Sequence, residues 1–162
     1  MPSGSTRGLL GLDAAPAGDA EPLAAQTAAG MKRRDGRLAR VVIVDDDVFV
    51  RRLLRLTLPT SEFELAEASD GDIALDLVEA RGTELVLLDW QMPNVSGDEV
   101  LTRLKKRHPN LPVIVLTAAG EERRRARRLG ADAFLTKPFS PLQLLRTIEE
   151  LLEARGAEEG VA

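Results

Sequence analysis

The 162-residue chain contains no cysteine and a single histidine, His108. The absence of cysteine excludes disulfides, thiolate metal sites and cysteine nucleophiles, and one histidine excludes a metal site built from several imidazoles. Long hydrophobic runs are also missing, because the apolar stretch at 8–12 ends at Asp13, far short of the about 18 residues that a membrane-spanning helix needs. We therefore expect a cytoplasmic protein without a membrane segment.

An excess of positive charge is absent as well. The chain has 22 Lys and Arg against 26 Asp and Glu, which gives a net charge of -4. It therefore has no global surplus of cations with which to neutralise a nucleic-acid backbone, and we expect no direct nucleic-acid binding. The content of 44% hydrophobic and 30% charged residues is instead typical of a globular protein.

The N-terminal segment differs in composition from the rest of the chain. Residues 1–30 contain eight Ala, five Gly and three Pro, with four leucines as the only large aliphatic side chains. Such a segment cannot bury a core. We predict a disordered leader over 1–37, one domain over 38–155 and a short tail over 156–162. A second methionine, Met31, leaves open whether residues 1–30 are translated.

Short apolar runs alternate with segments of helical periodicity from Arg40 onward. This pattern predicts strands at 41–45, 63–67, 84–88, 112–116 and 132–135. It predicts helices at 47–58, 71–81, 97–107, 121–129 and 141–154. Nearly all-aliphatic strands are typical of a sheet that is covered on both faces. Five alternating units therefore indicate an α/β domain with a parallel sheet.

Polar residues follow the predicted strands at the points where ligands bind to open parallel sheets, outside the carboxyl ends of the strands. Three consecutive acids at 45–47 end the first strand, and the third strand runs into Asp89. The fourth strand ends in Thr117, and the fifth leads to Lys137. Adjacent carboxylates repel one another unless a cation or solvent separates them, so the acids suggest a metal.

This set of residues suits phosphoryl transfer. Magnesium prefers oxygen ligands and is commonly held by one or two carboxylates together with a substrate phosphate. A carboxylate can attack phosphorus while a metal and an ammonium group neutralise the phosphoryl oxygens. Asp89 is the natural acceptor in this interpretation, and Lys137 is the ammonium group.

Four segments resemble the receiver domain of two-component response regulators. They are Val-Ile-Val-Asp-Asp-Asp at 42–47, Leu-Leu-Asp-Trp-Gln-Met-Pro at 87–93, Leu-Thr at 116–117 and Leu-Thr-Lys-Pro-Phe at 135–139. The resemblance extends over 38–155 and includes Gly97. It implies a flavodoxin-like (βα)5 doubly wound parallel sheet with strand order 2-1-3-4-5.

The resemblance also implies a role for each residue of the site. Asp89 is the phosphoacceptor and belongs to the metal site. Asp46 is the direct ligand of Mg2+ (or Mn2+), and Asp45 is its partner that acts largely through water. The backbone carbonyl of Gln91 completes the metal ligands. Lys137 pairs with the phosphoryl group.

Two further residues form the switch that the resemblance implies. Thr117 supplies the hydroxyl that moves onto the phosphoryl oxygens, and Phe134 is the aromatic residue that turns inward behind it. Some relatives carry Tyr where this chain has Phe134, so an output contact through a phenol hydroxyl is absent here. The resemblance also implies a cis bond between Lys137 and Pro138.

The predicted fourth helix carries a run of arginines. Such a run is usually a solvated helix face, but receivers use this side of the domain for output, so it could dock an acidic partner. The run consists of Arg123, Arg124, Arg125, Arg127 and Arg128. A leucine-rich stripe on the last helix is expected to face the core first, with a phosphorylation-dependent dimer contact as the second interpretation.

These observations predict a stand-alone response regulator. After Phe139 the chain is too short for a helix-turn-helix output domain, so output should occur through contact with a downstream protein target. The phosphoryl donor should be a histidine kinase or a phosphotransfer protein. We expect a switch that catalyses only its own phosphorylation and dephosphorylation, and not a turnover enzyme.

Two alternatives remain beside this prediction. One is an interaction scaffold that acts without phosphorylation. The other is an aspartyl-phosphate phosphatase of the haloacid dehalogenase type, with Asp45 as nucleophile and Asp47 as general acid. Such enzymes need a longer core and a late acidic pair after the fourth strand, where this chain has Thr-Ala-Ala at 117–119.

Overall fold

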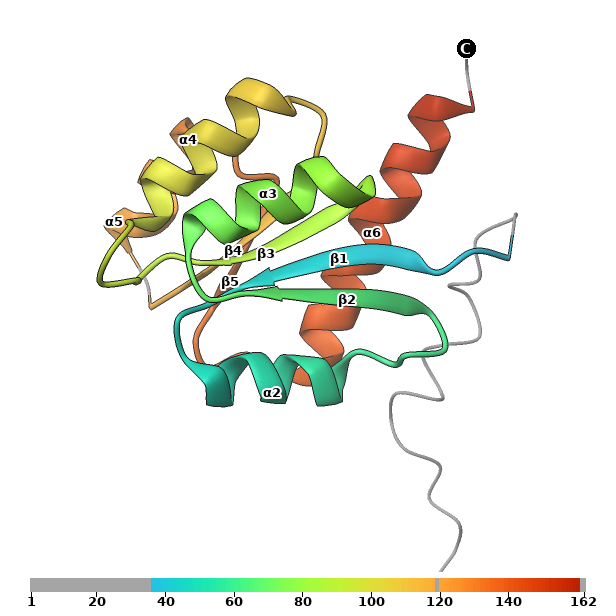
Figure 1. Cartoon of the computed structure of the whole chain (residues 1–162), viewed down its shortest axis with the longest axis horizontal. Helices are drawn as coiled ribbons and strands as arrows, with labels where there is room; N and C mark the ends of the chain where they lie inside the picture. Colours follow the sequence, from blue (N-terminus) through green and yellow to red (C-terminus); the bar gives the residue numbers. More distant parts are fainter. Residues whose placement is uncertain (1–35, 119, 161–162) are drawn as a thin grey trace, which may run out of the picture.

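The computed structural model describes residues 36–118 and 120–160, so the predicted leader lies almost entirely outside the described residues. Strands and helices alternate along the described chain (Figure 1). The strands are β1 (Ala39–Val44), β2 (Phe63–Ala68), β3 (Leu85–Asp89), β4 (Val113–Thr117) and β5 (Ala133–Thr136). The helices are α2 (Val48–Thr57), α3 (Gly71–Arg81), α4 (Gly97–Arg107), α5 (Glu121–Arg128) and α6 (Pro141–Glu159).

The five strands form one parallel sheet in the order β2-β1-β3-β4-β5. This order confirms the predicted flavodoxin-like, doubly wound fold. In the register, Val44 at the end of β1 pairs with Leu88 of β3, and Asp89 pairs with Leu116 of β4. The residues that follow these strands therefore lie along one edge of the sheet, on the left in Figure 1 where the strand arrows point.

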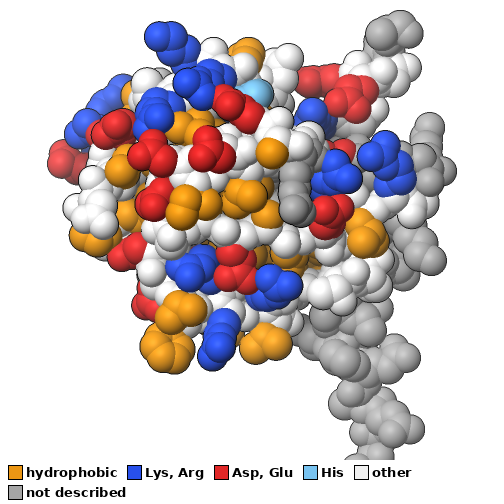
Figure 2. All heavy atoms as spheres, viewed as in Figure 1, with side chains coloured by type: hydrophobic (Ala, Val, Ile, Leu, Met, Phe, Trp, Pro, Cys, Tyr) orange, Lys and Arg blue, Asp and Glu red, His pale blue; other side chains and the backbone are white. Residues whose placement is uncertain are grey.

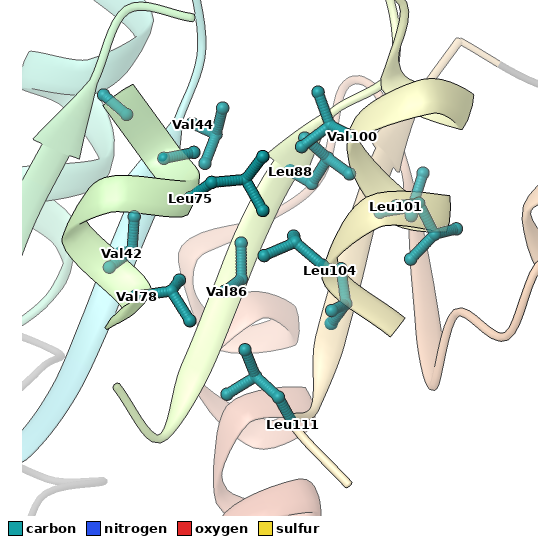
Figure 3. Close-up of a cluster of buried hydrophobic side chains, with 14 of the residues drawn as sticks. Val42, Val44, Leu75, Val78, Val86, Leu88, Val100, Leu101, Leu104 and Leu111 are labelled. Carbon is teal, nitrogen blue, oxygen red and sulfur yellow. The ribbon is translucent and has the colours of Figure 1, made fainter. Parts of the chain in front are cut away.

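Both faces of the sheet are buried because successive side chains of a strand point to opposite faces. Val42 and Val44 of β1 face α3 and α4, and Figure 3 shows them packed with leucines and valines of these helices and of β3. Val41 and Ile43, the alternate residues, belong to the core beneath α2 and α6. The near-continuous aliphatic strands predicted from the sequence are explained by this double burial.

Polar caps start several helices where the sequence changes from strand to helix. The side chain of Asp47 accepts the N–H of Phe49 at 2.8 Å and caps α2. Asp70 caps α3 by accepting the N–H of Ile73 at 2.9 Å. Caps of this kind satisfy N–H groups that have no partner inside the helix.

Helix α6 continues to Glu159, beyond the end predicted at 154. Arg155 contributes to this extension, because its Nε atom pairs with Glu159 one turn later at 3.1 Å. Its guanidinium group also donates to the carbonyl of Glu84 at 3.2 Å, just before β3. A contact with a distant segment therefore supports the last turns. The domain limits at 38 and 155 stay predictions.

Helix α2 exposes apolar side chains on one face. Phe49, Leu53 and Leu56 are 74%, 63% and 85% exposed, and their spacing of four and three residues puts them on the same side of the helix. Figure 2 shows hydrophobic side chains at the bottom of the view, over α2. Among the described residues no helix is long and apolar enough to span a membrane.

Candidate functional site

Three carboxylates meet at the edge of the sheet. Asp45 and Asp46 follow β1, and Asp89 is the last residue of β3. Each offers an oxygen within 4.8 Å of the other two. Asp45 is only 1% exposed and Asp89 only 4%, whereas Asp46 is open to solvent. Negative charges this close together favour a bound cation.

The carboxylate of Asp45 is held by the backbone on one side only. Its Oδ1 atom accepts the N–H of Asp47 at 2.9 Å, while Oδ2 is buried without a hydrogen-bond partner among the described residues. Burial raises the pKa of Asp45 to about 6, and the nearby charge of Asp89 adds to this effect. Arg51 of α2 also holds Asp45 in place, because its guanidinium group donates to the backbone carbonyl of Asp45 at 2.6 Å.

Lys137 reaches the cluster from the loop after β5. Its Nζ atom lies 2.9 Å from Oδ1 of Asp89 and 3.8 Å from Oδ2 of Asp45. The N–H of Lys137 donates to the carbonyl of Thr117 at 2.8 Å, which fixes the loop to the end of β4. The bond between Lys137 and Pro138 is cis, as the resemblance implied.

Asp89 combines burial with a cationic partner. Burial raises its pKa, and the hydrogen bond and charge of Lys137 offset part of that effect. The N–H of Gln91 approaches the same Oδ1 atom at 3.4 Å. Asp89 is therefore a partly shielded carboxylate beside an ammonium group, which suits an acceptor of an anionic group.

The donor set fits a magnesium ion. The ligands are carboxylate oxygens that lie close together at the carboxyl ends of β1 and β3. The Oδ2 atom of Asp45, which has no hydrogen-bond partner among the described residues, is an oxygen that an ion or its bound water would satisfy. The side chain of Gln91 points its amide to Glu122 instead, at 2.9 Å. A metal contact from Gln91 would therefore come from its backbone carbonyl, and that role stays a prediction.

The loop after β3 folds back closely on itself. The N–H of Gly97 donates to the carbonyl of Trp90 at 3.2 Å. A Cβ atom at Gly97 would lie 2.7 Å from the Cα of Trp90, so only glycine fits there. This close approach sets the path of the loop that carries Gln91.

The two predicted switch residues contact α5. Thr117 is the buried last residue of β4, and its hydroxyl donates to the carboxylate of Glu122. Phe134 lies half-buried on β5. The guanidinium carbons of Arg123 and Arg127 lie 5.5 and 5.6 Å from the centre of its ring, which is the range of cation–π contacts.

Sequence reasoning missed Glu122. An acidic residue in the first turn of a helix is ordinarily explained by the helix dipole, so the sequence alone does not mark Glu122 as part of the site. The available signal was its position five residues after Thr117, which lets the first turn of α5 face the end of β4. The five arginines of α5 are all exposed, and Arg125 pairs with Asp98 of α4.

The family model for the response regulator receiver domain matches residues 41–149, which include the whole cluster and all of the sheet except the first two residues of β1. The chain belongs to this family. The match argues against the phosphatase alternative, and Asp47, its supposed general acid, caps α2. The family binds Mg2+ through acidic residues and acts as a phosphoacceptor with histidine kinases and downstream effectors.

Receiver domains of known structure share this fold. A CheY-like receiver domain from Methanospirillum hungatei is 30% identical with a TM-score of 0.71, and the match covers 75% of this chain and 99% of that one. NtrX from Brucella abortus is 34% identical with a TM-score of 0.71, and the match covers 77% of this chain and 29% of NtrX.

The transcriptional regulatory protein SrrA from Staphylococcus aureus is 40% identical over 114 residues, which are 69% of this chain and 47% of SrrA. The chain thus spans about half the length of the curated relatives it matches. The predicted family and fold are confirmed.

Proposed function

We propose that this receiver is a switch in which Asp89 accepts a phosphoryl group from a histidine kinase or a phosphotransfer protein. The main support is the burial of Asp89 with Lys137 at 2.9 Å and two further carboxylates within 4.8 Å. An oxygen of Asp89 attacks phosphorus as the bond from phosphorus to the donor imidazole nitrogen breaks. An acyl phosphate forms on Asp89. The donor nitrogen keeps the electron pair of the broken bond, and the imidazole becomes neutral when it takes up a proton from solvent.

The residues that would hold the metal are Asp45, Asp46 and Asp89, together with the carbonyl of Gln91. A bound Mg2+ or Mn2+ ion supplies positive charge for the phosphoryl oxygens. Lys137 supplies a second positive charge from the chain itself, and it already contacts Asp89 before transfer. The buried position of Asp89 limits the access of water to the acceptor.

The proposed output involves Thr117, Phe134 and the arginines of α5. The phosphoryl oxygens would attract the Thr117 hydroxyl, and the space behind it would let Phe134 turn inward. Because Arg123 and Arg127 lie over the ring of Phe134, a movement of the ring would change their positions. The arginine face of α5 would then present a different surface to an acidic downstream partner.

The partners remain part of the proposal. The exposed apolar face of α2 starts at Phe49, three residues after Asp46, and would offer a protein donor a contact beside the site. Three further expectations stay predictions: that the receiver acts without an attached output domain, that it dimerises on phosphorylation, and that it is cytoplasmic. The absence of direct nucleic-acid binding also stays a prediction, and SrrA is named a transcriptional regulatory protein. We propose self-phosphorylation and self-dephosphorylation as the only chemistry.

The test uses Asp89→Asn, which keeps the shape of the side chain and removes the nucleophile. Incubation with acetyl phosphate and Mg2+ should add one phosphoryl group to the wild type, measured by intact mass, and none to the variant. Asp47→Asn is the control, because asparagine caps helices as well as aspartate, and it should react like the wild type. A wild type that stays unmodified, or a phosphoryl group at Asp45 in the variant, would overturn the proposal.

A further inference from the structure

The carboxylate of Glu122 joins three segments that surround Asp89. Its Oε2 atom accepts the hydroxyl of Thr117 at the end of β4, and its Oε1 atom accepts the side-chain amide of Gln91 at 2.9 Å. The hydrogen bond from Thr117 is the main reason that the pKa of Glu122 is lowered, with smaller contributions from Gln91 and the N–H of Ala118. Both carboxylate oxygens of Glu122 therefore accept hydrogen bonds from residues beside Asp89.

This arrangement occupies the only proton of the Thr117 hydroxyl. A threonine hydroxyl can donate one hydrogen bond, and here it donates to a carboxylate, an acceptor that makes a stronger bond than a neutral group does. The same proton cannot be donated to a phosphoryl oxygen at the same time. The Glu122 contact must therefore break before Thr117 can bind a phosphoryl group on Asp89.

The charge of Glu122 acts in the same direction. Its carboxylate is bonded to the side chain of Gln91, whose own N–H approaches Asp89 at 3.4 Å. Phosphorylation adds negative charge to Asp89, and like charges in a partly buried site repel one another more strongly than in water. Glu122 therefore favours the unphosphorylated state by hydrogen bonding and by charge.

We propose that Glu122 is a positioning residue that holds Thr117 away from the acceptor and so limits the phosphorylation of Asp89. This inference rests on the proposed function, because the competing acceptor for Thr117 is a phosphoryl group on Asp89. If a contact must first be released, the protein is in its reactive state for only a fraction of the time, and its apparent reactivity is the intrinsic reactivity multiplied by that fraction. Removal of the contact should raise that fraction.

The first experiment compares Glu122→Gln and Glu122→Ala with Glu121→Gln. Glu121 lies in the same first turn of α5 and is exposed, without a hydrogen bond or ion pair to any described residue. Its replacement changes the charge at the helix start equally. With acetyl phosphate and Mg2+, both Glu122 variants should phosphorylate Asp89 about tenfold faster than wild type. Glu121→Gln should stay within about twofold.

A second comparison separates positioning from charge alone. Thr117→Val removes the hydroxyl and keeps the shape of the side chain. In a Thr117→Val background, Glu122→Gln should change the rate by less than about twofold, because the contact that it breaks is already missing and only the smaller effect of the charge is left. A tenfold acceleration in that background would overturn positioning through Thr117.

The outcomes distinguish this inference from the function on which it rests. A wild type that accepts no phosphoryl group overturns the proposed function. A wild type that is phosphorylated at Asp89, with Glu122→Gln and Glu122→Ala no faster than Glu121→Gln, overturns the role of Glu122 alone. Trp90 emission and urea unfolding test whether each variant is folded. If Glu122→Gln does not fold, the comparison of Glu122→Ala with Glu121→Gln decides the role of Glu122.

Discussion

Replacement of Asp45 with asparagine should stabilise the metal-free protein at neutral pH. Asp45 is 1% exposed, and one of its oxygens has no hydrogen-bond partner among the described residues. Burial raises its pKa from 3.8 to about 6, so its surroundings disfavour the charged form. Asparagine keeps an oxygen for the N–H of Asp47 and has no charge to bury.

The size of the effect follows from the pKa. Each pKa unit corresponds to about 1.4 kcal/mol, so a pKa raised from 3.8 to about 6 corresponds to about 3 kcal/mol of lost stability at pH 7. Asparagine also loses the attraction to Lys137 at 3.8 Å, and its amide needs a new acceptor. We therefore expect Asp45→Asn to gain between about 1 and 3 kcal/mol in the free energy of unfolding.

The gain should depend on pH. Between about pH 4 and 6 the folded protein binds more protons at Asp45 than the unfolded chain does. The stability of the wild type should therefore fall as the pH rises through this window. Urea unfolding in EDTA, followed by Trp90 fluorescence, should show a larger advantage of the variant near pH 7.5 than near pH 4. The Asp47→Asn control should stay within about 0.5 kcal/mol of wild type.

Two results would refute this reasoning. One is a variant no more stable than wild type near pH 7.5 in EDTA, and the other is an advantage of equal size at both pH values. Added Mg2+ gives a further check, because an ion that binds only the folded state stabilises it by about 2.7 kcal/mol at 100 times its dissociation constant. The wild type should gain more from Mg2+ than the variant does.

Two further predictions concern the metal and the output face. Asp46→Asn should weaken Mg2+ binding, followed by Trp90 emission, about tenfold or more, whereas Asp47→Asn should change it less than about twofold; equal losses would contradict the assignment of Asp46. Arg124 and Arg128 are exposed and form no ion pair with a described residue. Their replacement with alanine should weaken binding of the phosphorylated protein to an acidic partner by about two- to thirtyfold at low salt. Asp89 should still be phosphorylated, and unchanged affinity at every salt concentration would identify a solvated face.

The sheet was predictable because strands that are buried on both faces consist almost entirely of aliphatic residues. The aliphatic runs of β3 and β4 differ from the predicted strands by a single residue at each end. The end of α6 was not predictable in the same way. It depends on the contact of Arg155 with the carbonyl of Glu84, which is 71 residues away.

The residues of the site also fall into a predictable group and an unpredictable group. Asp45, Asp89 and Lys137 follow strand ends, and the ends of parallel strands converge, so their proximity follows from the topology. Glu122 belongs to a helix, and its contact with Thr117 depends on how the first turn of α5 lies over β4. That orientation is a tertiary property. The stacking of Arg123 on Phe134 is of the same kind.

The unequal burial of the strands has a mechanical consequence. The edge strands β2 and β5 pair on one side only and are partly exposed, whereas β3 and β4 are buried along their whole length and paired on both sides. β5 is the shorter edge strand, with four residues against six in β2, and it carries Phe134 beside Arg123 and Arg127 of α5, so displacement should be confined to the side of β5 and α5. Helix α2 packs on the opposite side of the fold (Figure 1). We expect the surface near α2 to keep its shape in both states, so a donor would meet the same face before and after transfer, while a target would meet two different ones.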